Sequence, residues 1–450
     1  MTVAGRSTGV PPAPDGTGSE TASGTATPET TPGTATTDAA PGTATPETGS
    51  GTATTDAAPG TATPETGSGT ATTDAAPGTA TGAGNAGRPG ARRWPAGGRR
   101  GWRWWLYTAL VGAAGVWLAF SVAHLVLSGQ WWLWLAVDAI PPLAFLVVPV
   151  TLAVGAAPCR RSRRPVALLA AAALLLGAER SGVNLRALAG GDGPAPPDAV
   201  RIFTWNTGYW DEGGQSESLY RVLRDADADV YLLQEYWYAE TAGPTGATLD
   251  RLRAEFPDLH LAVVGELVTL SRFPILHRLP LEAPDLPPVV AGAGEQWRYK
   301  VLRTDLDLGA GRVLSTYNAH LPVQLSPDHS PFGADFYRII REQHAQREPQ
   351  WRALARDVPT NRHPVLVAGD LNTSPAMGDL AKLPDGLRDA GYASRSLYPA
   401  TWSDTPGWPR WWRLDWALVS PEVRVHSYRF GGTTHGASDH RGQHLVLSIP

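Results

Sequence analysis

The stretch "VLVAGDLN", residues 365–372, joins a short apolar run to a Gly-Asp pair and an asparagine. Such a run, bounded by glycine, is typical of a buried β-strand. A polar stretch with helical spacing precedes it, from about Asp335 to Arg356. "VRIFTWN" (residues 200–206) and "VYLLQE" (residues 230–235) likewise end an apolar run in an amide or a carboxylate. From about residue 199 onward, the sequence therefore predicts a mixed α/β domain.

Ionisable residues recur where the other expected strands end. His320 closes "LSTYNAH", Asp415 lies in "RLDWAL", and Asp439 and His440 precede the final strand "QHLVLSIP". Taken singly, such residues are more often turn formers or solvated strand ends than catalytic groups. Loops beyond strand ends, however, converge on one rim of a sheet, where a rigid scaffold can hold chemical groups in place. The order of the whole series is therefore the informative feature.

In this order, the motifs resemble those of the endonuclease/exonuclease/phosphatase superfamily of magnesium-dependent phosphoesterases. The resemblance covers residues 199–450. It implies an α/β fold, a four-layer DNase-like sandwich whose last strand belongs to the catalytic sheet. It also implies that the protein is a hydrolase of phosphoric esters or anhydrides. The motifs are Asn206, Gln234-Glu235, "SRFPI" from Ser271, "NAH" from Asn318, "GDLN" from Gly369, "RLDWAL" from Arg413 and "SDH" from Ser438.

The resemblance implies a divalent cation as cofactor, Mg²⁺ or alternatively Mn²⁺, and no organic cofactor. Glu235 is the expected principal ligand, with Asn206 beside it and Asp439 as a further ligand. Carboxylate and amide oxygens suit Mg²⁺, which takes few protein ligands and keeps several waters. Gly208 stands where many nuclease members have a polar or acidic residue, and this departure weakens any proposal of a second metal ion.

The resemblance also implies roles for five residues around the phosphate. Asp370 orients or deprotonates the attacking water, and Asn372 hydrogen-bonds the phosphate. His440, held by Asp415, is a base or an electrostatic stabiliser, because a carboxylate fixes both the tautomer and the imidazolium form. His320 donates a hydrogen bond to the phosphate or to the leaving group. The sequence leaves open which histidine is the acid and which is the base.

Residues 1–90 consist mainly of Thr, Ala, Gly and Pro, and they contain no aromatic residue. An 18-residue unit recurs three times from Ser23 to Ala76. Solenoid repeats need an apolar face in each unit, and this unit has none. We therefore expect a disordered tail that acts as a tether rather than a folded repeat array.

Residues 91–190 are predicted to form a transmembrane helical anchor. Trp104–Leu127 contains no Lys, Arg, Asp or Glu, and a helix of this length can cross a bilayer core of about 30 Å. Trp131–Ala157 is a second apolar stretch, interrupted by an aspartate and two prolines. Val166–Ala178 is a third, shorter than a comfortable span.

The orientation of the domain depends on this third stretch. Arginines cluster before the first apolar stretch, at residues 92–103, and before the third, at residues 160–164. Both clusters belong in the cytoplasm, because loops rich in Lys and Arg are retained there. We expect a third crossing, which would place residues 195–450 outside the cytoplasm. A two-helix hairpin with the domain inside is the alternative.

The charge balance and the tryptophans bear on the substrate. Residues 201–450 contain 25 Lys and Arg against 30 Asp and Glu. This acidic balance argues mildly against a nucleic-acid partner, since nucleases gain affinity by neutralising phosphates. Residues 401–416, "TWSDTPGWPRWWRLDW", contain five tryptophans. They suit either a loop that rests in the lipid headgroup layer or core packing.

Anchor and domain together resemble the membrane-bound VanJ-like members of the superfamily, which are linked to teicoplanin resistance. That resemblance implies a multi-pass cell-membrane enzyme with an extracytoplasmic domain. Its expected partners are the membrane and a lipid substrate such as undecaprenyl pyrophosphate, and no protein partner is predicted. A membrane-tethered extracellular nuclease is the alternative. A catalytically silent headgroup-binding protein is a third hypothesis, against which the complete motif series argues.

Overall fold

A computed structural model describes residues 101–188, 194–209, 216–236, 246–288, 295–325, 329–403, 408–431 and 437–450. All of them belong to one of the two compact units into which the chain divides. The tail predicted at residues 1–90 lies outside the described residues.

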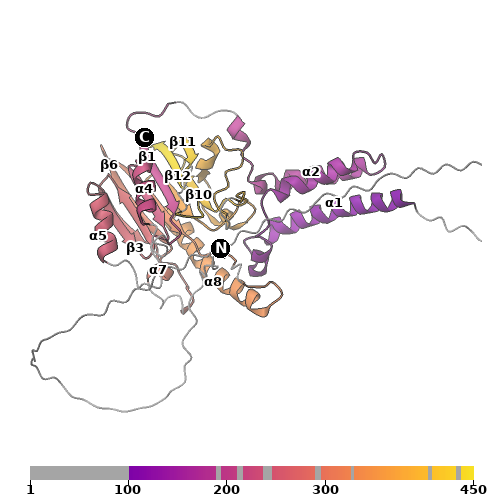
Figure 1. Cartoon of the computed structure of the whole chain (residues 1–450), viewed down its shortest axis with the longest axis horizontal. Coiled ribbons are helices and arrows are strands. Elements are labelled where there is room, and N and C mark those ends of the chain that lie inside the picture. The colour runs from indigo at the N-terminus through magenta and orange to yellow at the C-terminus, as the bar shows by residue number, and fades with distance from the viewer. Residues whose placement is uncertain are drawn as a thin grey trace, which may run out of the picture. The chain divides into compact units, whose positions relative to one another are not determined.

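Two six-stranded sheets form the centre of the domain (Figure 1). The first has the order β11-β12-β1-β2-β4-β3, and the second has the order β5-β6-β7-β8-β10-β9. The strands of the first sheet are β1 (Val200–Asn206), β2 (Val230–Gln234), β3 (His260–Val264), β4 (Leu267–Ser271), β11 (Arg424–Phe430) and β12 (Gln443–Ser448). Those of the second are β5 (Ile275–Pro280), β6 (Val301–Gly309), β7 (Arg312–His320), β8 (Val365–Asp370), β9 (Arg388–Asp389) and β10 (Asp415–Val419).

Each sheet has one parallel pair at its centre, β1 with β2 and β7 with β8. Parallel strands end at the same edge of a sheet, so the register of these pairs places their last residues side by side. Asn206 lies opposite Gln234 in the first sheet, and His320 lies opposite Asp370 in the second. The antiparallel strand β10 adds Asp415 directly opposite Asp370. The register therefore gathers the polar strand ends at one edge.

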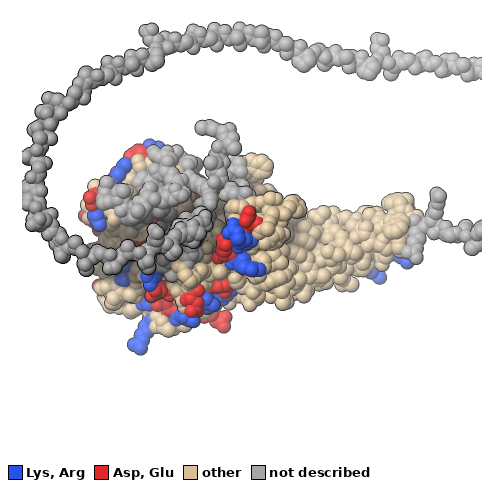
Figure 2. All heavy atoms as spheres, turned by 90° about the horizontal axis from the view of Figure 1, so that it is seen from below, with Lys and Arg blue, Asp and Glu red and all other residues tan. Residues whose placement is uncertain are grey.

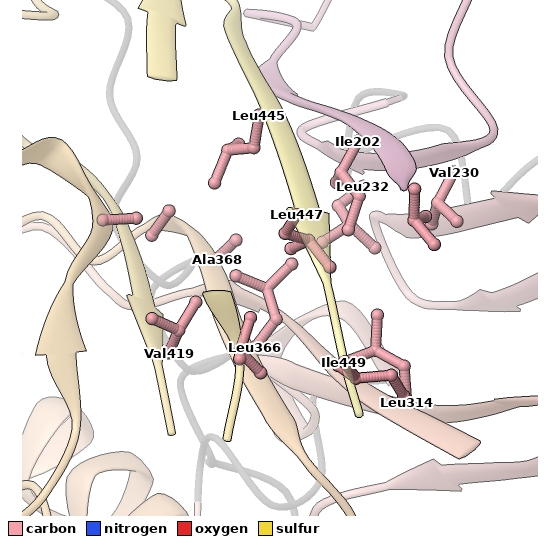
Figure 3. Close-up of a cluster of buried hydrophobic side chains, with 14 of the residues drawn as sticks. Ile202, Val230, Leu232, Leu314, Leu366, Ala368, Val419, Leu445, Leu447 and Ile449 are labelled. Atoms are coloured by element: carbon pink, nitrogen blue, oxygen red, sulfur yellow. The ribbon is translucent and has the colours of Figure 1, made fainter. Parts of the chain in front are cut away.

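Apolar side chains fill the space between the two sheets (Figure 3). Strand β1 shows how alternation builds the layers, since Ile202 belongs to this central cluster while Phe203 and Trp205 belong to the cluster on the outer face. Leu232 and Leu366 meet Ile202 from β2 and β8. Burial of each such side chain stabilises the fold by about 1.5–3 kcal/mol.

Helices cover the outer face of each sheet. On the first, Leu219 and Leu252 pack with Phe203, and on the second, Trp351 packs with Tyr317. The resulting order of helix, sheet, sheet and helix confirms the predicted four-layer DNase-like α/β sandwich. The elements that complete the domain are α4 (Ser216–Ala226), α5 (Gly246–Glu255), α7 (Glu295–Arg298), α8 (Ala334–Asp357) and the short 3-10 helices η6 (Val358–Thr360), η7 (Asp379–Lys382) and η8 (Ala390–Ala393).

Three α-helices lie within the predicted anchor region. The second apolar stretch is not one helix, because Pro141 and Pro142 lack backbone N–H groups and interrupt it. Helix α3 ends at Gly177, and Gly182, after the short 3-10 helix that follows, turns the chain with a φ of +69°. The elements are α1 (Trp102–Leu127), η1 (Trp132–Ala136), α2 (Ala144–Ala156), α3 (Arg163–Gly177), η2 (Glu179–Ser181) and η3 (Leu185–Leu188).

Among the described residues, one helix is long and apolar enough to cross a membrane, with its apolar span at Trp104–Leu127. Helices α2 and α3 are shorter. The side chains of Val116, Val154 and Leu175, one from each helix, are exposed. Figure 2 shows that these helices form a surface almost free of charged residues, with arginines at one end of it. An exposed apolar surface of this extent marks a site of contact with membrane or protein.

A polar bridge joins the two sheets beneath the gathered strand ends. Asn318 on β7 donates through Nδ2 to the carbonyls of Leu233 (3.0 Å) and Val268 (2.9 Å), which belong to the other sheet. Its Oδ1 accepts a hydrogen bond from Gln234 Nε2 at 2.6 Å. All of these groups are buried, and a buried polar group without a partner costs roughly 1–3 kcal/mol. The bridge therefore fixes how the sheets lie against each other.

Gly369 makes this close approach sterically feasible. A Cβ at this position would lie 2.1 Å from the Ala319 carbonyl oxygen and 3.0 Å from Gln234 Nε2, and its φ is +135°. Gly311 also has a positive φ, +76°, but a Cβ there would meet no atom within 4 Å. Alanine at Gly369 would meet both steric crowding and backbone strain, whereas alanine at Gly311 would meet backbone strain alone.

We predict that Gly369→Ala lowers the free energy of unfolding by more than about 3 kcal/mol, because strain and forced separation of β7 and β8 add. Gly311→Ala is the control and should cost only about 1 kcal/mol, from backbone strain alone. Thermal or urea unfolding of the full chain in detergent, followed by tryptophan fluorescence, measures both. Equal losses in the two variants would contradict the close packing at Gly369.

Candidate active site

The edge where the parallel strands end brings residues of both sheets into contact. Asn206, at the end of β1, donates through Nδ2 to Asp370 Oδ2, at the end of β8, over 3.0 Å. The Asn206 Oδ1 atom accepts from the backbone N–H of Gly208 at 3.0 Å. This link joins the first sheet to the second at the predicted site, and both side chains are fully buried.

A tight turn after β8 holds Asp370 and Asn372. The Asn372 backbone N–H donates to Asp370 Oδ1 at 2.8 Å, and its Nδ2 donates to the Leu321 carbonyl at 2.9 Å. Asn372 has a φ of +46°, a left-handed conformation that asparagine tolerates better than most residues. The "GDLN" motif thus combines a glycine for close packing with an asparagine for the turn.

His440 and Asp415 form the predicted pair. His440 Nδ1 lies 2.8 Å from Asp415 Oδ2, which leaves Nε2 facing Asp370 Oδ2 at 3.6 Å. The imidazole lies in the wall of the site because the His440 backbone N–H donates to Ser438 Oγ at 3.0 Å. Ser438 Oγ in turn donates to the Asn206 carbonyl at 2.8 Å. The "SDH" motif is therefore tied to the end of β1.

His320 approaches the same Asp370 oxygen, Oδ2, that His440 faces. Its Nε2 is 3.3 Å from Glu235 Oε1 and 3.9 Å from Asp370 Oδ2. Its Nδ1 lies 2.6 Å from Glu266 Oε1, a residue that the motif analysis did not single out. Each histidine therefore has a carboxylate on Nδ1 and directs Nε2 toward Asp370.

Glu266 belongs to a buried group that the sequence motifs missed. Lys300 Nζ donates to its Oε1, and Tyr209 Oη donates to its Oε2 at 3.3 Å. Lys300 also lies over the Trp297 ring, 5.2 Å from its centroid. One signal was available, since Lys300 is one of only two lysines in this arginine-rich chain. The other lysine, Lys382, also contacts an acidic side chain, Asp379, at 2.7 Å.

Asp439, the third predicted metal ligand, points elsewhere. It is exposed, and its Oδ2 accepts a hydrogen bond from Trp402 Nε1 at 2.9 Å. It is absent from the acidic and imidazole clusters that the described residues form. His435, which also precedes the final strand, lies outside the described residues.

The site has more buried acid than base around its centre. Burial raises the pKa of Glu235 to about 7. Burial also raises the pKa of Asp370. Burial acts in the same direction on Glu266, but Lys300 and His320 outweigh it and lower the pKa of that carboxyl to about 2. Negative charge on Glu235 and Asp370 is therefore costly unless a cation offsets it.

The carboxylates determine the protonation of both histidines. Burial opposes the charged imidazole of His440, but Asp415 and Asp370 raise its pKa well above the ordinary value. His320 is similarly buried, and the Glu266 carboxylate raises its pKa as well. Two imidazoles whose pKa values are raised and whose Nε2 atoms both face Asp370 favour the binding of a phosphate anion.

The donor set fits a divalent cation. Two overlapping clusters have ligand atoms within 4.8 Å of one another: Glu235 with His320 and Asp370, and Asp370 with Asp415 and His440. Glu235 and Asp370 supply carboxylate oxygen atoms, the ligands that Mg²⁺ and Mn²⁺ prefer, and the Asn206 side chain lies beside Asp370 with its Nδ2 donating to Oδ2. Glu235 has a φ of +48°, a left-handed conformation, so the backbone turns at the residue that carries this carboxylate.

A match to a protein-family model identifies the family of this chain. The model of the endonuclease/exonuclease/phosphatase family matches residues 203–440. Among curated proteins, no sequence matches this chain. Among solved structures, the endonuclease/exonuclease/phosphatase from Bacteroides vulgatus is similar, with 18% identity, a TM-score of 0.40, and coverage of 56% of this chain and 99% of that one. Sphingomyelinase C from Streptomyces griseocarneus has 18% identity and a TM-score of 0.39, with coverage of 55% and 99%.

The family match spans more than half of the chain and includes all eight predicted site residues, which are Asn206, Glu235, His320, Asp370, Asn372, Asp415, Asp439 and His440. The chain therefore belongs to the endonuclease/exonuclease/phosphatase family, whose members are divalent-metal-dependent hydrolases of phosphoester bonds.

Proposed function

We propose that the protein is a Mg²⁺-dependent phosphoesterase of the membrane-anchored, VanJ-like type. It hydrolyses a lipid phosphate or pyrophosphate, such as undecaprenyl pyrophosphate, where the outer face of the cell membrane meets water. One observation carries the enzymatic part of the proposal. Five ionisable residues from five different segments converge in two clusters that share Asp370. They are Glu235, His320, Asp370, Asp415 and His440.

Hydrolysis forms a bond between a water oxygen and phosphorus and breaks the bond from phosphorus to the leaving oxygen. Asp370 is placed to orient the water and to accept its proton, because Asn206 and Asn372 hold the carboxylate in one orientation. His440, fixed by Asp415, stabilises the charge that develops on the phosphoryl oxygens.

His320 serves the leaving oxygen or the phosphate. Its Nε2 is buried and has no hydrogen-bond partner among the described residues, while Nδ1 is held by Glu266. An imidazole in this position donates its Nε2 proton to the substrate that enters. When bound, Mg²⁺ draws charge from the phosphoryl oxygens, and Glu235 with Asn206 would hold it.

Tryptophans beside the site support a lipid substrate. Trp402 packs against Trp412 and approaches His440, with ring centroids 5.8 Å and 6.5 Å apart. Trp412 Nε1 donates to the Ala139 carbonyl of the anchor region at 3.2 Å. Trp408 and Trp411 are 67% and 41% exposed, unlike the buried Trp416. Exposed tryptophans next to an anchor suit the headgroup layer.

The packing of the anchor supports an odd number of crossings. The Arg161 guanidinium lies 5.5 Å from the centroid of the Tyr107 ring, so the basic turn before α3 lies beside the start of α1. The arginines of that turn therefore lie at the end of the helices where α1 begins. The positive-inside bias places that end in the cytoplasm and the domain outside. Helices α2 and α3 have 13 and 15 residues, so a crossing by either requires flanking segments or local thinning of the bilayer.

We expect the full chain in detergent with Mg²⁺ to release phosphate from undecaprenyl pyrophosphate and to leave supercoiled plasmid DNA intact. Phosphate release measured with a colorimetric assay, and plasmid nicking followed on agarose gels, distinguish the two substrates. Chelation with EDTA should abolish release, and added Mg²⁺ should restore it. Rapid nicking without phosphate release would favour the nuclease instead.

His440→Ala should lower kcat by about 10²–10⁴-fold, because the group that stabilises the phosphoryl charge is lost. His444→Ala is the matched control, since that side chain packs against the Phe203 ring instead of facing the site. Both variants should remain folded by circular dichroism. Full activity in His440→Ala would contradict the role given to His440, whereas a wild-type protein without activity would leave the binding-only hypothesis in place.

A reporter fused after Pro450 tests the orientation. Alkaline phosphatase, which needs an oxidising compartment, should be active in this fusion, because three crossings carry the C-terminus out of the cytoplasm. A cytoplasmic reporter fused at the same point is the control and should be inactive. The reverse pattern would establish the two-helix hairpin.

A further inference from the structure

The loop that follows the catalytic turn contacts the anchor. Residues 373–379 continue directly from Asp370 and Asn372, and they end at the start of η7. Among them, Ala376, Met377 and Gly378 bond to residues of α1 and η2. A simple membrane tether requires no buried, directional contacts with such a loop.

Ser128, at the C-terminal end of α1, is the central contact. Its Oγ accepts a hydrogen bond from the Gly378 backbone N–H at 2.7 Å and donates to Asp138 Oδ1 at 2.7 Å. Ser128 and Asp138 are 3% and 1% exposed, so water does not provide a substitute partner. The segment after α1, Ser128 to Asp138, is called the anchor turn. The Ser128 hydroxyl therefore fixes the backbone of the loop relative to the anchor turn.

Two further side chains bond to the carbonyls of the same loop. His124 Nδ1 accepts from Trp134 Nε1 at 3.0 Å. Because an indole can only donate, the His124 proton lies on Nε2, which donates to the Ala376 carbonyl at 2.7 Å. Arg180, after α3, donates through Nη1 to the Met377 carbonyl at 2.6 Å. Side chains of α1 and η2 thus contact consecutive residues of the loop.

Packing leaves no room between the loop and the anchor turn. A Cβ at Gly378 would lie 2.2 Å from the Ser128 carbonyl oxygen, and a Cβ at Gly129 would lie 2.8 Å from the Gly378 carbonyl carbon. A shared apolar cluster adjoins this contact, formed by Leu135 of η1 together with Phe336, Ile340 and Met377 of the domain. The anchor turn therefore completes part of the hydrophobic core of the domain.

Arg347 connects the same loop to the other half of the site. This fully buried side chain on α8 donates through Nη2 to Thr373 Oγ1 at 2.8 Å and through Nη1 to the Pro322 carbonyl. Its Nη2 also lies 3.6 Å from Asp379 Oδ2. Pro322 follows His320 by two residues, so one guanidinium links the loops that carry His320 and Asp370.

We propose that the anchor is a positioning element of the active site. Ser128, His124 and Arg180 hold residues 373–379, and through this loop they keep Asp370 and Asn372 in their catalytic geometry. The catalytic unit then includes the anchor turn, and residues 195–450 alone lack part of their own scaffold. The effect on turnover rests on the proposed function, whereas the effect on the loop does not.

The test compares Ser128→Ala with Ser121→Ala in the full chain in detergent. Ser121 is an equally buried serine of α1, but its hydroxyl bonds only to the Trp117 carbonyl of its own helix. Arg180→Ala is a second variant, with Arg186→Ala as its control, because Arg186 lies over the Tyr392 ring. Hydrogen exchange of peptides that cover residues 371–380 reports on the loop without any substrate.

We expect Ser128→Ala and Arg180→Ala to accelerate exchange in these peptides by about tenfold or more, since local opening is no longer opposed. With farnesyl pyrophosphate as a water-soluble probe, kcat should fall about tenfold while KM stays within about twofold. In an Asn372→Ala background, Ser128→Ala should add little further loss, because both changes disturb the same turn. The control variants should match the wild-type protein in each measurement.

Unchanged exchange in both Ser128→Ala and Arg180→Ala would overturn the proposal, whatever the activity. Wild-type kcat in both variants would overturn the coupling to catalysis. A wild-type protein that hydrolyses no phosphoester refutes the proposed function instead, and the exchange measurement then decides the structural inference by itself.

Discussion

Hydrogen bonds between the two sheets are the constraint on which the active site depends. Apolar side chains supply most of the attraction between the sheets, but such contacts are non-directional and tolerate small shifts. The bonds from Asn318 to the Leu233 and Val268 carbonyls permit one arrangement, because any other would leave buried polar groups unpaired. The bond from Asn206 to Asp370 then joins the strand ends across the same interface. Residues from distant segments can therefore converge to the accuracy that phosphoryl transfer requires.

The electrostatics of the site follow from this convergence. Each histidine is held by a buried carboxylate, His440 by Asp415 and His320 by Glu266, and the free nitrogen of each faces Asp370. Lys300 offsets the charge of Glu266, whereas no lysine or arginine in the described part of the chain forms an ion pair with Glu235 or Asp370. The site thus combines two imidazoles whose raised pKa values favour a phosphate with two carboxylates whose oxygens suit a metal ion. The two imidazoles need an anionic substrate to balance their charge, and the two carboxylates need a cation.

The boundary of the catalytic unit differs from the change in composition along the chain. The composition changes near residue 195, where the apolar anchor ends and the alternating strands begin. The contacts divide the chain differently, because Leu135 packs in a cluster with Phe336 and Met377, and Ser128 bonds to Gly378. A serine at a helix end and an apolar residue in a turn carry no sequence pattern that assigns them to a neighbouring domain. This packing also makes the exposed tryptophans near Trp412 continuous with the anchor.

The sequence by itself indicated the strands β1, β2, β7, β8, β10 and β12, the long helix α8 and the candidate site residues at the ends of these strands. Strand alternation is a local property with a period of two, and residues such as Asn206, Asp370 and His440 stand at fixed offsets from strand ends. Only the tertiary structure decided the partners of these residues. Glu266 and Lys300 lie outside the motifs, and they meet His320 because β4, β6 and β7 bring them together from positions far apart in the chain. Tertiary structure also directed Asp439 to Trp402 and the end of α1 to the catalytic loop, since local sequence does not encode which distant surface a side chain will face.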